Sequence, residues 1–93
     1  MVPQQPGWSA RRDILGEAVL NDRQEYIGKV EDIIITSDKA SFAVVDVGHF
    51  VGAARHNIAI PLDQLQISTD GVVLPGATKE ALNAVPPIEF IEP

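Results

Sequence analysis

Two histidines and an aspartate lie close together near the middle of the sequence. His49 and His56 fall within the glycine-containing stretch Gly48–His56, and Asp46 precedes it. Two imidazoles and a carboxylate can hold a divalent metal ion. Their spacing matches no metal-binding motif, and we expect both rings to be solvated loop residues. We therefore assign no metal ligand, and a small-ligand or metal site in Gly48–His56 stays as the alternative.

Three carboxylates, Asp46 among them, could suggest acid–base chemistry. Glu31 and Asp32 are adjacent in a β-rich run, and successive residues of a strand point to opposite faces, so the two cannot easily share a proton. We expect one of them, Asp32 rather than Glu31, to accept hydrogen bonds from a turn or to pair with a basic residue. Asp46 lies in an apolar run, where a buried carboxylate needs a partner. Arg55 and Lys29 are the expected partners.

No set of residues forms a recognisable nucleophile–base arrangement. The serines lie in turn-like or tail-like contexts. The glycines of Gly48–His56 lack the spacing of a phosphate-binding loop, and we expect no helix after them to supply a dipole. The sequence therefore assigns no catalytic residue and no cofactor-binding residue, and it predicts a non-enzymatic protein.

The composition excludes several classes of partner. The chain has 93 residues, a hydrophobic fraction of 45% and a net charge of -6, which indicates one globular domain. The negative charge disfavours direct binding to nucleic acids and to anionic membranes. There is no cysteine, no secretory signal and no apolar run long enough for membrane insertion. We expect a cytoplasmic protein.

The elements that position these residues are short strands. We expect residues 1–13 to form a polar tail, in which Trp8 is the exception. This side chain folds back over apolar surface, anchors a ligand or partner, or belongs to a mobile tail. Apolar runs then alternate with turns expected at Asp22–Glu25, Ser37–Ala40 and Asp70–Gly71. One helix is expected over residues 77–85. The pattern predicts an all-β fold, a small barrel or sandwich of about six strands with one short C-terminal helix.

The expected helix and core follow from the same pattern. Thr78 is the expected N-cap of the helix, with Ala81, Leu82 and Val85 as its apolar stripe. The proline pair at 86–87 ends it. The residues expected in the core are Val19, Val30, Ile34, Val44, Ile58, Ile60, Leu65 and Leu82.

The long run over residues 26–36 is apolar on both of its faces. Val30 and Ile34 share one face, whereas Ile27, Ile33 and Ile35 share the other. A bulge or sharp coil near Gly28 would reconcile the two faces. Alternatively, a helix or another subunit covers the outer face.

Five blocks of sequence resemble the PRC-barrel domain, in the family's order and spacing. The blocks are Ile14–Leu20, Tyr26–Ile33, Phe42–Gly48, Asn57–Leu65, and Ala77–Leu82 with Val85–Pro87. Leu62 stands where family members often have an aromatic residue. The resemblance covers residues 14–87 as a PRC-barrel domain, with residues 1–13 as a tail and 88–93 as a C-terminal extension.

The resemblance implies a small PRC-like β-barrel without catalytic residues. The same fold is that of the cytoplasmic domain of the photosynthetic reaction-centre H subunit and of the C-terminal domain of a ribosome-maturation factor. This chain is similar to the stand-alone members. The resemblance further implies an interaction or adaptor module that binds other macromolecules, often as a dimer.

Apolar residues outside the expected core indicate where a partner binds. The expected interaction surface consists of Trp8, Ile27, Ile33, Ile35, Phe90 and Ile91. Monomers rarely expose contiguous apolar patches of more than a few hundred Å². We therefore expect a symmetric homodimer, in which edge-strand pairing is one form of contact. The identity of any other protein partner is open.

Overall fold

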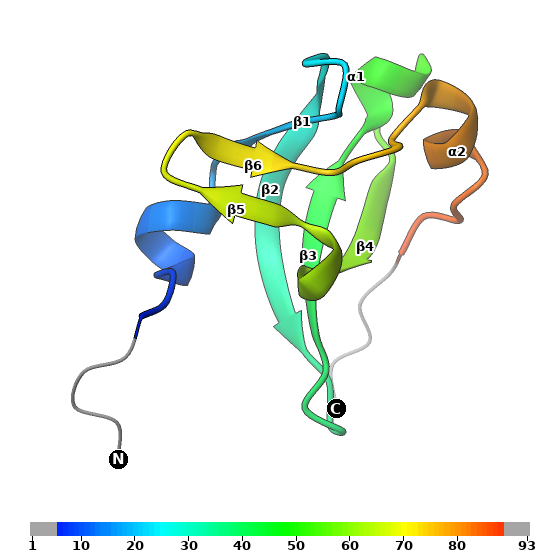
Figure 1. Ribbon diagram of the computed structural model, residues 1–93. Coiled ribbons are helices and arrows are strands. Elements are labelled where there is room, and N and C mark those ends of the chain that lie inside the picture. Colours follow the sequence, from blue (N-terminus) through cyan, green and yellow to red (C-terminus); the bar gives the residue numbers. More distant parts are fainter. Residues whose placement is uncertain (1–5, 89–93) are drawn as a thin grey trace.

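The computed structural model describes residues 6–88 (Figure 1). The strands are β1 (Ala18–Leu20), β2 (Tyr26–Ile35), β3 (Ser41–Asp46), β4 (Asn57–Pro61), β5 (Gln66–Ser68) and β6 (Gly71–Val73). The helical segments are η1 (Ala10–Ile14), α1 (Gly48–Val51), η2 (Leu62–Gln64) and α2 (Lys79–Asn83). The protein is therefore mostly β-structure, as predicted, but it has more helical turns than the single helix that the sequence indicated.

The six strands form one mixed sheet in the order β4-β3-β2-β1-β6-β5. Neighbouring strands are antiparallel, except that β1 and β6 run parallel. Figure 1 shows the hairpin of β5 and β6 running across the direction of β2, β3 and β4, and both halves contribute to one core. The sheet is curved around this core. Among the described strands the hydrogen bonding does not close into a ring, so β4 and β5 are its edges.

Strand β2 carries two irregularities in its pairing. In the pairing of β2 with β1, Ile27 has no partner, whereas Tyr26 and Gly28 on either side of it are paired. In the pairing of β2 with β3, Glu31 has no partner. An extra residue bends a strand and shifts which of its side chains face the core. The expected bulge near Gly28 is thus confirmed, and a second one follows it.

The two bulges correct the expected faces of β2. Ile27 is 1% exposed and lies in the core, so its expected place on an outer surface is wrong. Ile33 is partly buried and packs against the core. Ile34 is only half-buried, because it is paired with Phe42 on the face opposite to the core. The expectation that Ile34 is a core residue is therefore wrong.

The remaining core predictions are confirmed. The seven other predicted residues are all buried: Val19, Val30, Val44, Ile58, Ile60, Leu65 and Leu82. Val44 is buried but lies outside the main cluster, which the other six share with Ile27, Val45, Val47 and Val72 among others. Branched aliphatic side chains therefore build the core, as the low aromatic content requires.

Gly28 lies where β2 passes close to the end of β3. A Cβ atom at this position would stand 2.4 Å from the carbonyl oxygen of Asp46 and 2.8 Å from Cγ1 of Val45. Real Cβ atoms do not approach other atoms this closely, so only glycine fits without movement of β3. The absence of a side chain at position 28 thus permits this close approach of β2 to β3.

A buried asparagine ties the β1–β2 turn to the segment before α2. Asn21 is 2% exposed. Its Oδ1 accepts from the N–H groups of Arg23 and Glu25, at 3.0 and 2.9 Å. Its Nδ2 donates to the carbonyl oxygen of Ala77 at 3.0 Å. One side chain therefore both shapes the turn and anchors a distant part of the chain.

The C-terminal helix begins as the sequence predicts. The hydroxyl of Thr78 accepts from the N–H of Ala81 at 3.1 Å, which confirms it as the N-cap. The helix ends at Asn83, before the expected end at residue 85. Only Leu82 of the expected apolar stripe is buried, whereas Ala81 and Val85 are exposed. No helix within residues 6–88 is long and apolar enough to cross a membrane.

The corrected faces of β2 predict different costs for two isoleucine substitutions. Ile58→Ala, at a residue 1% exposed, should lower the free energy of unfolding by about 2–5 kcal/mol. Ile34→Ala should cost only about 1 kcal/mol, because its side chain is half-buried outside the core. Urea denaturation measures both. Equal losses would show that Ile34 packs in the core after all.

Candidate functional site

The connection between β3 and β4 is closed at its base by Asp46. Its Oδ1 accepts from the N–H of Gly48 at 2.9 Å and from the N–H of His56 at 3.0 Å. The N–H of Val47 also donates to the carbonyl oxygen of His56 at 2.9 Å. One carboxylate thus holds both ends of the segment that the sequence offered as an alternative ligand site. That segment contains the short helix α1 and is not an open loop.

The same hydrogen bonds stabilise the ionised form of Asp46. They hold the pKa of Asp46 below its ordinary value of 3.8, with the N–H of His56 as the largest cause and the N–H of Gly48 as the next. Partial burial opposes this shift, and the charge of Arg55 supports it. A carboxylate that ionises readily and accepts two backbone N–H groups is a structural anchor. It is poorly suited to act as a general base near neutral pH.

Arg55 binds groups other than Asp46. Its guanidinium lies 3.5 Å from a carboxylate oxygen of Glu31. The side-chain oxygen of Asn57 accepts from Nη2 and Nε of Arg55, at 3.1 and 3.2 Å, in the amide orientation that satisfies both groups. The expected hydrogen-bonded pairing of Asp46 with Arg55 or Lys29 is therefore replaced by backbone donors, because the chain folds back over the carboxylate. Arg55 contributes only through its charge.

The carboxylates of β2 take separate partners. Glu31 pairs with Arg55, whereas Oδ1 of Asp32 accepts from the N–H of Ile33 at 2.7 Å. Both residues are exposed. The sequence predicts that one of the two carboxylates accepts a hydrogen bond or pairs with a basic residue. In the structure each of them has such a partner.

The two histidines are not brought together around Asp46. The Nε2 atom of His56 lies 2.7 Å from the carbonyl oxygen of Val85. Since a carbonyl can only accept, this nitrogen carries the proton and ties the connection to the segment after α2. His49 is exposed on α1. Within residues 6–88, no three His, Cys, Asp or Glu side chains gather in a way that could hold a metal ion.

Gly48 is needed where α1 begins. A Cβ atom at this position would lie 2.7 Å from Cα of Arg55 and 2.9 Å from the backbone nitrogen of His56. The start and the end of the connection therefore pass within van der Waals contact. The glycine serves this close approach and leaves no room for a phosphate group between the two ends.

The expected interaction surface is divided by the fold. Ile35 is 68% exposed and Trp8 is 48% exposed, whereas Ile27 and Ile33 contribute to the core or pack against it. Phe90 and Ile91 lie outside the described residues. Trp8 belongs to the N-terminal segment and Ile35 to the end of β2, so the expected residues do not follow one strand face.

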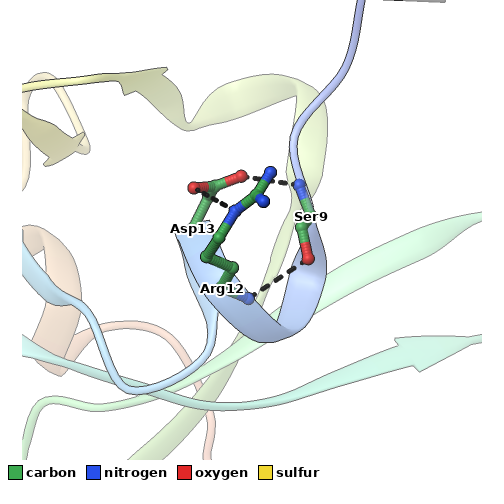
Figure 2. Close-up of polar contacts among 3 residues, drawn as sticks. All are labelled: Ser9, Arg12 and Asp13. Carbon is green, nitrogen blue, oxygen red and sulfur yellow. Dashed lines mark hydrogen bonds and ion pairs between the residues drawn. The ribbon is translucent and has the colours of Figure 1, made fainter. Parts of the chain in front are cut away.

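Trp8 lines a cleft of about 260 Å³ beside the turn that joins β5 and β6. Apart from Trp8, the lining side chains are polar, which does not fit a lid over apolar surface. Figure 2 shows the cap of the adjacent η1 turn. The hydroxyl of Ser9 accepts from the N–H of Arg12, and the carboxylate of Asp13 accepts from the N–H of Ser9 at 2.8 Å. The turn that follows Trp8 is thus fixed by local hydrogen bonds.

An apolar row crosses the outer face of the sheet. The register places Ile34 of β2, Phe42 of β3 and Pro61 of β4 side by side, and all three are half-buried. Next to this row, residues 40–42 and 61–63 line a groove of about 430 Å³. We call Ile34, Phe42 and Pro61 the outer row. The sequence does not reveal it, because pairing across three strands depends on the bulge at Glu31.

The family comparison agrees with this architecture. Residues 9–80, more than half of the chain, match the family described as PRC-barrel domain. No curated protein matches the sequence.

The hydrogen bonds of Asp46 predict a loss of stability. Asp46→Ala leaves two backbone N–H groups without an acceptor and should lower the free energy of unfolding by about 1–3 kcal/mol. Asp46→Asn keeps an acceptor at the same place and is the matched control, with a smaller expected loss. Chemical denaturation at neutral pH compares the two variants with the natural chain.

The lowered pKa of Asp46 gives the sign of the pH dependence. Because this pKa is lower in the folded chain than in the unfolded one, the stabilisation is complete above the ordinary value of 3.8. It is lost as the pH falls through the lower folded value. The difference in unfolding free energy between the natural chain and Asp46→Asn should therefore shrink with acidification. A difference that stays constant would contradict a role for the ionised carboxylate.

Proposed function

We propose that this chain, which belongs to the PRC-barrel domain family, is a non-enzymatic protein-interaction module that self-associates as a symmetric dimer. The observation that carries the proposal is the outer row with its adjoining groove, an apolar face on the side of the sheet away from the core. Apolar area left outside a core marks sites of association. A second copy of the same face is its simplest partner.

The polar groups support a non-enzymatic role. The pKa of Asp46 is lowered, and the residue is bonded to backbone donors; His56 is bonded to a backbone carbonyl. Asp46 and the Nε2 atom of His56 are therefore engaged in links between segments of the chain, and neither of these atoms is free to exchange a proton with a substrate. The same engagement disfavours the alternative, a ligand or metal site in Gly48–His56.

The charge of the chain restricts the kinds of partner. A net charge of -6 opposes nucleic-acid binding, and it opposes self-association only weakly, since salt screens exposed charges over about 8 Å. A protein partner other than a second copy would use the same apolar face. The cytoplasmic location stays a prediction.

Light scattering over a concentration series tests the proposed self-association. The natural chain should have the mass of two chains at micromolar concentration. Phe42→Asp, which places a charge in the outer row, should shift the protein toward the mass of one chain, because burying an unpaired carboxylate is unfavourable. Tyr26→Asp, at a residue 53% exposed outside this row, is the matched control and should leave the mass unchanged. A natural chain with the mass of one chain and no binding of a hydrophobic dye would refute the dimer.

A further inference from the structure

Strand β4 forms one edge of the sheet and directs half of its backbone groups outward. The N–H of Val47 donates to the carbonyl oxygen of His56, which sets the alternation of the β3–β4 ladder. The residues whose backbone groups point away from β3 are Asn57, Ala59 and Pro61. An outward row of this kind pairs readily with a strand of another chain unless something prevents it.

The side chains of β4 do not protect this edge. Proteins commonly protect an exposed edge with charged residues or with a very short strand. Strand β4 has five residues, none of them charged. The other edge strand, β5, has three residues, and two of them are polar and exposed. Protection of β4 therefore has to come from its own backbone or from a neighbouring segment.

The segment that follows α2 lies against the start of this edge (Figure 1). The N–H of Ile88 donates to the outward carbonyl oxygen of Asn57 at 2.8 Å. Three residues earlier in the chain, the carbonyl oxygen of Val85 accepts from Nε2 of His56 at 2.7 Å. The two ends of this segment are thus bonded to the first residue of β4 and to the residue before it. We call residues 85–88 the edge strap.

His56 fixes the place of the strap relative to the sheet. Its backbone N–H donates to Oδ1 of Asp46, its carbonyl oxygen accepts from Val47, and its ring donates to Val85. The strap also begins from a fixed point, because Leu82 of α2 is buried in the core and its carbonyl oxygen accepts from the N–H of Val85 at 3.2 Å. The strap is therefore held by the sheet on one side and by α2 on the other.

The strap does not create a new edge in place of the one that it covers. Its two central residues, Pro86 and Pro87, have no N–H and offer no donor to another strand. Pro61 likewise gives the far end of β4 no donor. Within residues 6–88, Ala59 is thus the one outward position of β4 that keeps both a donor and an acceptor. One such position is shorter than the strands from which stable sheets are built.

We infer that the edge strap is a block, built into the fold, that prevents strands of other copies of this chain from pairing with β4. With the strap in place, a second strand cannot reach the carbonyl oxygen of Asn57. Release of the strap opens an uncharged edge of five residues. The inference concerns this edge alone, and it does not require the dimer proposed above, which uses the outer row.

Two substitutions at Ile88 isolate the backbone bond of the strap. Ile88→Pro removes both the side chain and the N–H that donates to Asn57, whereas Ile88→Ala removes the side chain and keeps the N–H. By light scattering, Ile88→Ala should have the same mass as the natural chain. Ile88→Pro should form larger assemblies that grow with protein concentration and bind a dye specific for stacked β-strands.

Two results would overturn the inference. Equal masses of the two variants at every concentration would show that the bond to Asn57 does not protect β4. Large assemblies of both variants would assign the protection to the side chain of Ile88 and not to the strap's backbone bond.

Hydrogen exchange provides a second test, which does not depend on assembly. The amide of Ile88 should exchange more slowly than an unbonded amide. His56→Ala removes the ring that holds Val85 and should speed this exchange by about fivefold or more, measured relative to the amides of β3. His49→Ala, at an exposed residue of α1, is the matched control and should leave the rate unchanged. Equal rates in the two histidine variants would contradict the role given to His56 and, with it, the strap.

These outcomes are separate from those of the proposed function. The mass of the natural chain decides whether it dimerises, whereas the difference between the two Ile88 variants decides whether the strap blocks the edge. A one-chain mass for the natural protein, with large assemblies of Ile88→Pro alone, would refute the dimer and support the strap. A two-chain mass for the natural protein, with equal masses of the two variants, would leave the dimer standing and overturn the strap.

Discussion

The close approach of β2 and β3 at Gly28 is the constraint on which the rest of the structure depends. The carbonyl of Asp46 occupies the place where any side chain at position 28 would begin. This contact lies beside the bulge at Ile27, where β2 bends around the core. It thereby fixes the end of β3, and with it the carboxylate of Asp46. That carboxylate then closes the connection and sets where β4 starts.

The same series of contacts accounts for how the conspicuous polar residues are engaged within the protein. Asp46, Arg55 and His56 each bind a partner within the protein, and each partner belongs to a different segment. A connection held at both ends keeps β4 in a single register against β3. The polar network thus positions the apolar outer face of the sheet relative to its core.

The sequence predicts the features that depend on neighbouring residues. The turn before Gly71, the cap at Thr78 and the apolar core positions follow from local patterns of residue type. A bulge near Gly28 was one of the two arrangements that would reconcile the two apolar faces of this strand, and the structure contains it at Ile27.

The features that depend on distant segments could not be read from the sequence. The second bulge, at Glu31, turns Ile33 toward the core and Ile34 toward the outer face, the reverse of what the sequence predicts. A shift of the register by one residue is not visible in the types of the residues involved. In the sequence Asn21 has the features of an ordinary turn residue. Its hydrogen bond to the carbonyl oxygen of Ala77 appears only in the folded structure. The outer row can be predicted only when the pairing register of all three strands is known. Of the residues expected on an interaction surface, Ile27 and Ile33 lie in or against the core for this reason, whereas Trp8 and Ile35 are exposed.

The free energy of unfolding of Gly28→Ala tests most directly whether this approach organises the fold. Gly28 does not have the left-handed backbone conformation that disfavours a side chain, so an added methyl group acts through the contact with β3 alone. We predict that the free energy of unfolding falls by at least about 1–3 kcal/mol, as for overpacking of a well-packed interior. Gly7→Ala, where an added Cβ meets nothing within 4 Å, should change stability by less than about 0.5 kcal/mol. A Gly28→Ala protein as stable as the natural chain would contradict the account.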